Sequence, residues 1–197
     1  PSCVSASSRC RLLSTLLETA AVAGYTAASK ADQLSVLVNN AMMTAISNYV
    51  AQNFGAGKKD RIRLGVRASL IQTEAFNILM CIGILLLRHP IVELFLSNPT
   101  AEIYHYSDAF LTIEAPFYFL LGLLAVYRTS IQSIQNGRAP FAACMIELVM
   151  RLAATVWLSR FLGYTAVCIA SPLAWFGAVA LLIPVYYRMM MKPVKTV

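Results

Sequence analysis

Apolar residues gather in long blocks along this chain, and each block has the length of a helix that crosses a lipid bilayer. A spanning helix needs about 20 mostly apolar residues. The blocks are separated by turn signals such as His89-Pro90 and Asn136-Gly137, where helical geometry is disfavoured. The pattern predicts five spans, at about 33–57, 64–87, 109–134, 141–161 and 161–187. The expected fold class is an all-α, multi-pass membrane bundle.

The first predicted span differs from the others because it carries many amides and hydroxyls, although it has no charged residue. Polar side chains persist at membrane depth when they face other helices or a water-filled cavity. We therefore expect this helix to have one wet side. The segment at 1–20 is rich in serine, and its apolar run is short. It is expected to be a truncated or aberrant N-terminal segment that does not span the membrane, in preference to a processed targeting peptide.

Composition supports the membrane assignment. Of the 197 residues, 58% are hydrophobic and 13% are charged, against about 45–50% and about 25% in soluble domains. The net charge of +7 does not indicate nucleic-acid binding, because the cations lie in short clusters between apolar blocks and form no basic polar face. The five cysteines have neither metal-ligand nor disulfide spacing. No cofactor or metal is expected.

The basic residues predict the side that each connector faces. In a five-span layout, alternate connectors lie on the same side of the bilayer. One set holds nine lysines and arginines, whereas the opposite set holds only Arg88 and Arg160. The positive-inside rule makes the first side cytoplasmic. Its nine basic residues are Lys58, Lys59, Arg61, Arg63, Arg67, Arg138, Arg188, Lys192 and Lys195.

The stretch Gly55-Ala56-Gly57-Lys58 has the look of a phosphate-binding loop but lacks its spacing. That loop needs four residues between its glycines and a hydroxyl residue after the lysine. Here a single residue separates the glycines, and Lys59 stands where the hydroxyl belongs. A glycine in left-handed conformation that ends a helix is the better interpretation, with the basic residues then lying at the helix terminus and among the lipid headgroups.

Several segments, in sequence order, resemble the multidrug and toxic compound extrusion (MATE) family. They are "AVAGYTAASKADQL", "NYVAQNFGAGKKDRIRLGV", "FYFLLGLLAVYRTSIQSIQNGRAP", "ELVMR" and "GYTAVCIASPLAW". The resemblance covers about residues 21–191 and corresponds to the C-terminal half of such a transporter, from its eighth helix to its twelfth. It implies a lobe at 21–191, preceded by the aberrant segment 1–20 and followed by a cytoplasmic tail at 192–197.

Family membership implies twelve helices in two lobes around a central cavity, which exchange amphipathic, often cationic drugs for protons or sodium. The chain departs from this pattern because the first lobe is absent, so it is expected to be inactive alone. The expected partners are the lipid bilayer, small-molecule drugs, and the missing N-terminal lobe or another copy of the chain. The expected location is a plasma membrane, as a multi-pass protein of the bacterial inner membrane.

Ionisable residues at membrane depth are costly and are therefore candidates for ion coupling. Glu147 and Arg151 are four apart, which predicts either a structural ion pair or a proton relay. Glu114 precedes Ala115-Pro116 and lies either near the headgroups or at a coupling site. Glu74 is either a surface acid or a buried acid whose charge is disfavoured by desolvation.

Two groups of polar residues are candidates for the wall of a substrate cavity. Arg128 and Gln132, followed by Gln135, form a stripe at helical spacing on the third span. The aspartate that some family members carry in this region has no counterpart here. The first span presents a mixture of amide, thioether and aromatic groups, which suits promiscuous ligands but equally suits helix packing. The residues of this second group are Asn39, Asn40, Met42, Met43 and Tyr49.

No arrangement of residues in the chain indicates an enzyme, because no nucleophile stands with a histidine and an acid at a characteristic spacing. His89 and His105 both fall in the predicted outer connector region and are expected to be bystanders. Two functions remain open. One is the C-terminal lobe of a proton- or sodium-coupled drug exporter, and the other is a non-transporting membrane scaffold derived from half a transporter.

Overall fold

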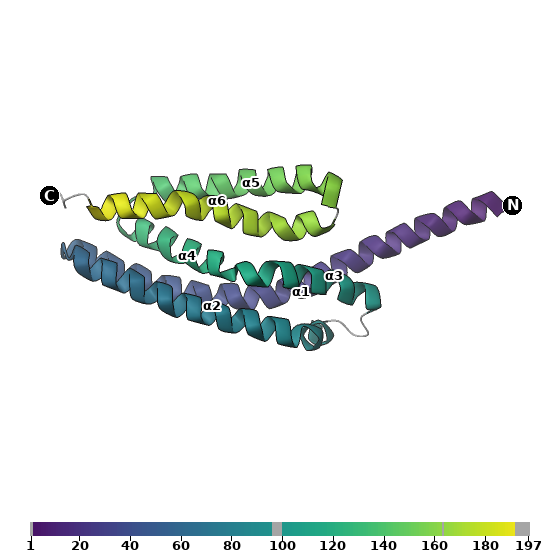
Figure 1. Cartoon of the computed structure of the whole chain (residues 1–197), viewed down its shortest axis with the longest axis horizontal. Coiled ribbons are helices and arrows are strands. Elements are labelled where there is room, and N and C mark those ends of the chain that lie inside the picture. Colours follow the sequence, from purple (N-terminus) through teal and green to yellow (C-terminus); the bar gives the residue numbers. More distant parts are fainter. Residues whose placement is uncertain (1, 96–99, 163, 192–197) are drawn as a thin grey trace.

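The computed structural model describes residues 2–95, 100–162 and 164–191, and this part of the chain contains helices but no strand. The all-α class is therefore confirmed. Figure 1 shows long helices lying roughly side by side. They are α1 (Ser2–Gly55), α2 (Lys59–Phe95), α3 (Ala101–Glu114), the short 3-10 turn η1 (Ala115–Phe117), α4 (Tyr118–Ser133), α5 (Arg138–Leu162) and α6 (Tyr164–Met191).

Four helical segments in the described residues are long and apolar enough to cross a membrane. They are Lys59–Phe95, Ala101–Ser133, Arg138–Leu158 and Tyr164–Met191, which correspond to the last four predicted spans. The first predicted span, 33–57, is helical as part of α1 but is not among these four. Its amides lower its apolarity, so its position across the membrane stays a prediction.

Residues 2–20 form the first part of α1, which runs without a break for 54 residues, and the truncated or aberrant character of this segment stays a prediction. No proline occurs between Ser2 and Gly55, and the single glycine inside this stretch is Gly24. Nothing therefore interrupts the backbone hydrogen bonds. Figure 1 shows the N-terminal part of α1 extending beyond the other helices.

Two further boundaries differ from the predicted ones. The second span does not stop at His89-Pro90, since α2 continues through Pro90 to Phe95. Figure 1 shows these last turns at an angle to the rest of α2, as expected where proline removes one backbone hydrogen bond. The third span begins at Ala101 rather than 109, and Pro116 falls within it, at the 3-10 turn that separates α3 from α4. Residues 97–100, where the sequence Ser-Asn-Pro-Thr also predicts a turn, lie mostly outside the described residues.

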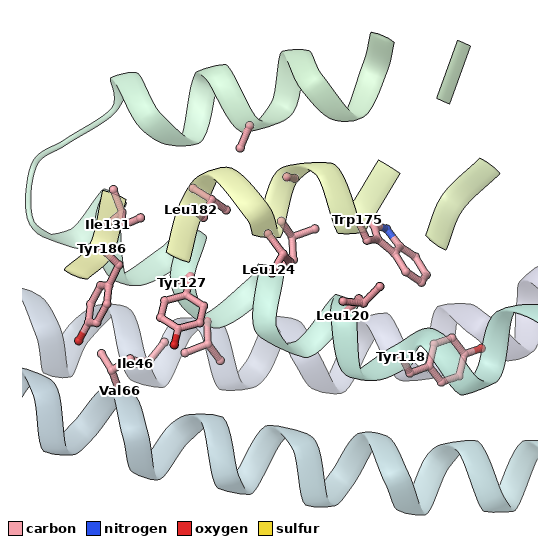
Figure 2. Packing of buried hydrophobic residues seen from close by; sticks show 14 of the residues in the cluster. Ile46, Val66, Tyr118, Leu120, Leu124, Tyr127, Ile131, Trp175, Leu182 and Tyr186 are labelled. Carbon is pink, nitrogen blue, oxygen red and sulfur yellow. The ribbon is translucent and has the colours of Figure 1, made fainter. Parts of the chain in front are cut away.

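The core is centred on α4 and α6. Helix α4 packs against α1, α2 and α6, whereas α5 is attached almost entirely through α6. Figure 2 shows Leu120 and Leu124 of α4 facing Trp175 and Leu182 of α6. More than half of the most apolar stretch of α6 is buried within the chain, against 11% for that of α5. The outer face of α5 is consequently an exposed apolar surface.

The turn after α1 is a helix exit, as predicted. Gly57 has a φ of 68°. The amide of Lys58 donates to the Asn53 carbonyl at 2.9 Å, and the amide of Gly57 donates to the Phe54 carbonyl at 3.0 Å. These two bonds form the motif that closes a helix on a left-handed residue. No phosphate loop is present at this turn.

The helix ends that were predicted to share one side of the membrane do lie together. The Lys59 ammonium donates to the Met189 carbonyl at 3.3 Å, and the Arg63 guanidinium donates to the Met190 carbonyl at 2.9 Å. The start of α2 thus meets the end of α6, and the connection from α4 to α5 lies at the same end in Figure 1. We call this the basic end. Lys192, Lys195 and the tail at 192–197 lie outside the described residues.

Candidate functional site

A chain of buried amides connects α1, α2 and α4. The side-chain amide of Asn39 on α1 donates to the Asn77 side-chain oxygen on α2 at 3.2 Å. The amide of Asn77 in turn donates to the Tyr118 carbonyl at the start of α4, at 3.1 Å. Asn39 is 2% exposed and Asn77 is 1% exposed. We call Asn39, Thr73, Glu74, Asn77 and Gly122 the amide layer.

Gly122 creates the space for this layer. A Cβ at this position of α4 would meet the Asn77 amide, and it would lie 2.6 Å from the Glu74 Oε1 and 3.2 Å from the Thr73 Cγ2. Only glycine lets the backbone of α4 approach three polar side chains of α2 so closely. This close approach brings the backbone of α4 next to the side chains of Thr73, Glu74 and Asn77.

Glu74 lies in the amide layer with one carboxylate oxygen unsatisfied. Its Oε1 is buried and has no hydrogen-bond partner among the described residues, and the same holds for the Thr73 hydroxyl. Of the two predicted positions, the buried one describes this oxygen better than the surface one. A buried carboxylate oxygen without a donor is costly and is therefore a candidate for reversible binding of a cation or proton.

Glu114 is also buried between helices, at 2% exposed, and its two predicted positions, near the headgroups or at a coupling site, stay predictions. It is the last residue of α3, directly before the 3-10 turn at Pro116. Because the proline interrupts the span in its interior and does not begin it, Glu114 faces the bundle. It interacts electrostatically with Tyr164 and Cys168 of α6.

Glu147 pairs with Arg128 of α4, so the expected pair with Arg151 is wrong. The Arg128 guanidinium donates to the Glu147 carboxylate at 2.6 Å, and the two side chains are 27% and 17% exposed. Arg151 is exposed on α5. The spacing of four residues would allow a Glu147–Arg151 pair within α5. Glu147 instead faces α4, where Arg128 is better shielded from solvent than Arg151.

The predicted stripe of Arg128, Gln132 and Gln135 does not form one face. Helix α4 ends at Ser133, and Gln135 follows it with a φ of 62°. The amide of Gln135 donates to the Gln132 carbonyl at 2.9 Å, which closes the helix. Gln132 is exposed whereas Arg128 is engaged with Glu147. The glutamines therefore mark the end of α4.

The exposed face of α1 carries an open groove of about 450 Å³. Its lining combines amides, hydroxyls and a thioether at helical spacing: Asn40, Met43, Thr44, Ser47 and Asn48. The Ser133 hydroxyl of α4 donates to the Ser47 hydroxyl at 3.0 Å beside it. Asn39 lies about 100° around the helix from Asn40, on the buried side. The predicted wet side of this helix is thus an exposed polar groove.

Tyr49 lies outside this groove. Its hydroxyl donates to the Arg61 carbonyl at 3.1 Å, and its ring covers Gly65 of α2. The residue therefore closes the α1–α2 hairpin, which is the packing interpretation of that position. Met42 and Tyr49 instead border a second surface hollow of about 470 Å³ between α1 and α2.

Sequence reasoning missed Thr73, Asn77 and Gly122. A signal was available, because Thr73 and Asn77 are four apart and therefore share a helix face within a predicted span. Gly122 gave no such signal, since an isolated glycine is common in spanning helices. Among the described residues, no group of three histidine, cysteine or acidic side chains is placed to hold a metal ion.

Comparison with known proteins gives two matches. The MatE family profile matches residues 10–157. A protein of Shewanella oneidensis described as an FAD transporter is 21% identical over 158 residues, which are 80% of this chain and 34% of that protein. The chain thus spans about a third of the length of the curated relative that it matches. No solved structure matches the chain.

Proposed function

Because this chain belongs to the MatE family, we propose that it is one lobe of a transporter that exchanges amphipathic organic solutes, cationic drugs among them, for protons or sodium. The chain is a MATE-type, multi-pass membrane protein. The proposal adds that the lobe belongs to the C-terminal half of the complete transporter, that it lies in a plasma membrane, and that it depends on a second lobe or a second copy for transport.

The observation that carries this proposal is the unsatisfied carboxylate of Glu74 in the amide layer. Three helices meet there and are joined by the Asn39–Asn77 and Asn77–Tyr118 hydrogen bonds, while buried oxygens of Thr73 and Glu74 have no hydrogen-bond partner among the described residues. Oxygen atoms without donors offer a place for a proton or a sodium ion. Occupancy of this position would change the contact between α2 and α4, because both oxygens lie beside the close approach at Gly122.

The groove on α1 is the proposed wall of the substrate path. It is next to the amide layer along the same helix, and its amides, hydroxyls and Met43 provide both hydrogen bonds and a polarisable surface. Asn40 and Asn39 are adjacent in sequence, so a movement of α2 against α1 would be transmitted to the groove. Glu114 and the Arg128–Glu147 pair lie outside this path and are proposed to be structural.

The relative favours a second class of substrate. The Shewanella oneidensis protein is described as an FAD transporter. This chain could accordingly belong to a carrier of aromatic compounds that bear phosphate, in place of cationic drugs. The two classes differ in charge, so binding experiments separate them.

The test is binding of ethidium and of FAD to the purified chain in detergent, at acidic and alkaline pH. We expect ethidium binding to weaken at acidic pH in the parent chain because protons compete at Glu74. In Glu74→Gln the pH effect should disappear. Glu93→Gln is the matched control, since it removes an exposed carboxylate from the same helix. FAD binding without ethidium binding would mean that the substrates are aromatic compounds that bear phosphate and not cationic drugs.

Accumulation of ethidium in cells with and without the chain provides the second readout. A lower accumulation means that copies of the chain supply one another with the second lobe. Unchanged accumulation together with pH-dependent binding supports a lobe that is inactive alone. If neither dye nor flavin binds, the transporter proposal fails and the non-transporting scaffold is favoured.

A further inference from the structure

A separate cavity at the basic end is not explained by transport. It lies between α2, α4 and α6 and has a volume of about 500 Å³. One wall carries two arginines of α2, and the other carries tyrosines and a methionine of α4 and α6. The residues that matter for the inference are Arg63, Arg67, Tyr127, Tyr186, Tyr187 and Met190. The amide layer and the groove on α1 share no residue with this cavity.

Arg63 and Arg67 differ in their hydrogen bonds and ion pairs. Arg63 donates to the Met190 carbonyl at 2.9 Å and lies 3.7 Å from the Asp60 carboxylate. It therefore caps the last turn of α6. Arg67 lies four residues further along α2, about one helical turn, in the same cavity wall, and it forms no ion pair with another of the described residues. Its guanidinium charge is available to a ligand.

The tyrosines complete a site with aromatic walls and hydroxyl donors. The Tyr127 and Tyr186 ring centroids are 5.2 Å apart, and those of Tyr186 and Tyr187 are 5.7 Å apart. Figure 2 shows the hydroxyl ends of Tyr127 and Tyr186 directed toward α2, where Val66 lies. The hydroxyls and the guanidinium groups thus line the same space, while the rings and Met190 form its apolar part.

The charge around the cavity favours an anion. Lys58, Arg61 and Arg188 belong to the same end of the bundle, and the carbonyls at the end of α6 are already bonded by Lys59 and Arg63. Among ligands of this charge, a phosphate group fits guanidinium and hydroxyl donors best. A phosphate carried on an apolar body would also cover the rings.

We propose that this cavity binds the headgroup phosphate of an anionic phospholipid. The cavity lies at the end of the spanning helices, where the positive-inside rule and the basic residues place the lipid headgroups. The phosphate lies between Arg63 and Arg67, and the glycerol and first acyl carbons lie against Tyr187 and Met190. A bound lipid bridges α2 and α6. This inference is independent of the proposed transport function.

The experiment is native mass spectrometry of the delipidated full chain, titrated with phosphatidylglycerol. Arg67→Gln should lower retention of the lipid about fivefold, since each basic residue near the headgroup contributes substantially to anionic-lipid binding. Arg61→Gln is the matched control. It removes the same charge from an exposed position on the same helix, outside the cavity. Its retention should fall clearly less than that of Arg67→Gln, because Arg61 adds only to the general charge of the basic end.

Two further arms identify the source of the phosphate. Phosphatidylcholine carries a phosphate but no net charge and should be retained less than phosphatidylglycerol. Inorganic phosphate in excess should not displace the bound lipid, because it lacks the apolar body. Equal retention by the parent chain, Arg67→Gln and Arg61→Gln would overturn the proposal. If inorganic phosphate binds and phosphatidylglycerol does not, the cavity is an anion site and the proposal that it holds a phospholipid is wrong. Tyr187→Phe should give an intermediate loss.

Discussion

Two carboxylates lie inside the predicted spans of this protein in opposite circumstances. Glu147 on α5 accepts a hydrogen bond from Arg128 of α4 at 2.6 Å. Glu74 on α2 lies in the amide layer with a buried oxygen that no described residue satisfies. Both are acids in apolar blocks of the sequence, and sequence alone placed both among the coupling candidates.

The difference separates a paired charge from one that we propose to be functional. A buried charge with a partner is neutralised and holds two helices in register, whereas removal of that partner leaves a charge that is costly to bury. A carboxylate oxygen without a partner contributes nothing comparable to stability, which is why Glu74 is the candidate for the proposed ion coupling. Stability measurements can distinguish the two carboxylates. Neutralising Arg128, the partner of Glu147, should destabilise the chain, whereas neutralising Glu74 should not.

The largest effect is expected from Arg128→Gln. It leaves the Glu147 carboxylate half-buried without its cation and should lower the free energy of unfolding by about 2–3 kcal/mol, less than for a fully buried pair. The measurement is unfolding of the chain by SDS from a mild detergent. Arg128→Gln combined with Glu147→Gln should recover most of the loss. A double variant as unstable as the single one would show that the pair does not stabilise the contact.

Gly122→Ala is expected to have the next largest effect. The added Cβ displaces the Asn77 amide and the Glu74 carboxylate, so stability should fall by about 1–2 kcal/mol. Gly83→Ala on α2 is the control, since a Cβ there meets nothing within 4 Å. That change should stabilise the helix by about 0.5–1 kcal/mol. The same unfolding titration measures both, and a stabilising Gly122→Ala would contradict the close approach.

Glu74→Gln should leave stability unchanged or raise it by up to about 1 kcal/mol. The amide keeps the size of the side chain and removes the buried charge that lacks a donor. Thermal unfolding followed by tryptophan fluorescence checks this. A loss similar to that of Arg128→Gln would mean that the Glu74 carboxylate has a stabilising partner, and the contrast between the two acids would disappear.

Arg151→Gln should have the smallest effect, within about 0.5 kcal/mol of the parent chain in detergent. Arg151 is exposed, and Glu147 is engaged with Arg128 instead. The thermal unfolding measurement applies here as well. If Arg151→Gln were as destabilising as Arg128→Gln, Glu147 would share its charge between both arginines.

The sequence was sufficient for features that depend on neighbouring residues. The long apolar blocks predicted the last four helices, the two-glycine turn predicted the exit of α1, and the quoted segments predicted the family. Boundaries near Pro90 and Pro116 were predicted less well. Membrane helices tolerate proline when adjacent helices satisfy the freed carbonyl, and adjacency is not visible along the chain.

Only the tertiary structure decided which polar groups meet. Spacing of four residues suggested a pair between Glu147 and Arg151, but the rotation of α5 against α4 selected Arg128. Asn39 of α1 and Asn77 of α2 are 38 positions apart and come together where these two helices pack, and Gly122 lets the backbone of α4 approach Asn77 from the other side. The period of a helix fixes which residues share a face, whereas the partner of that face is determined by packing between helices.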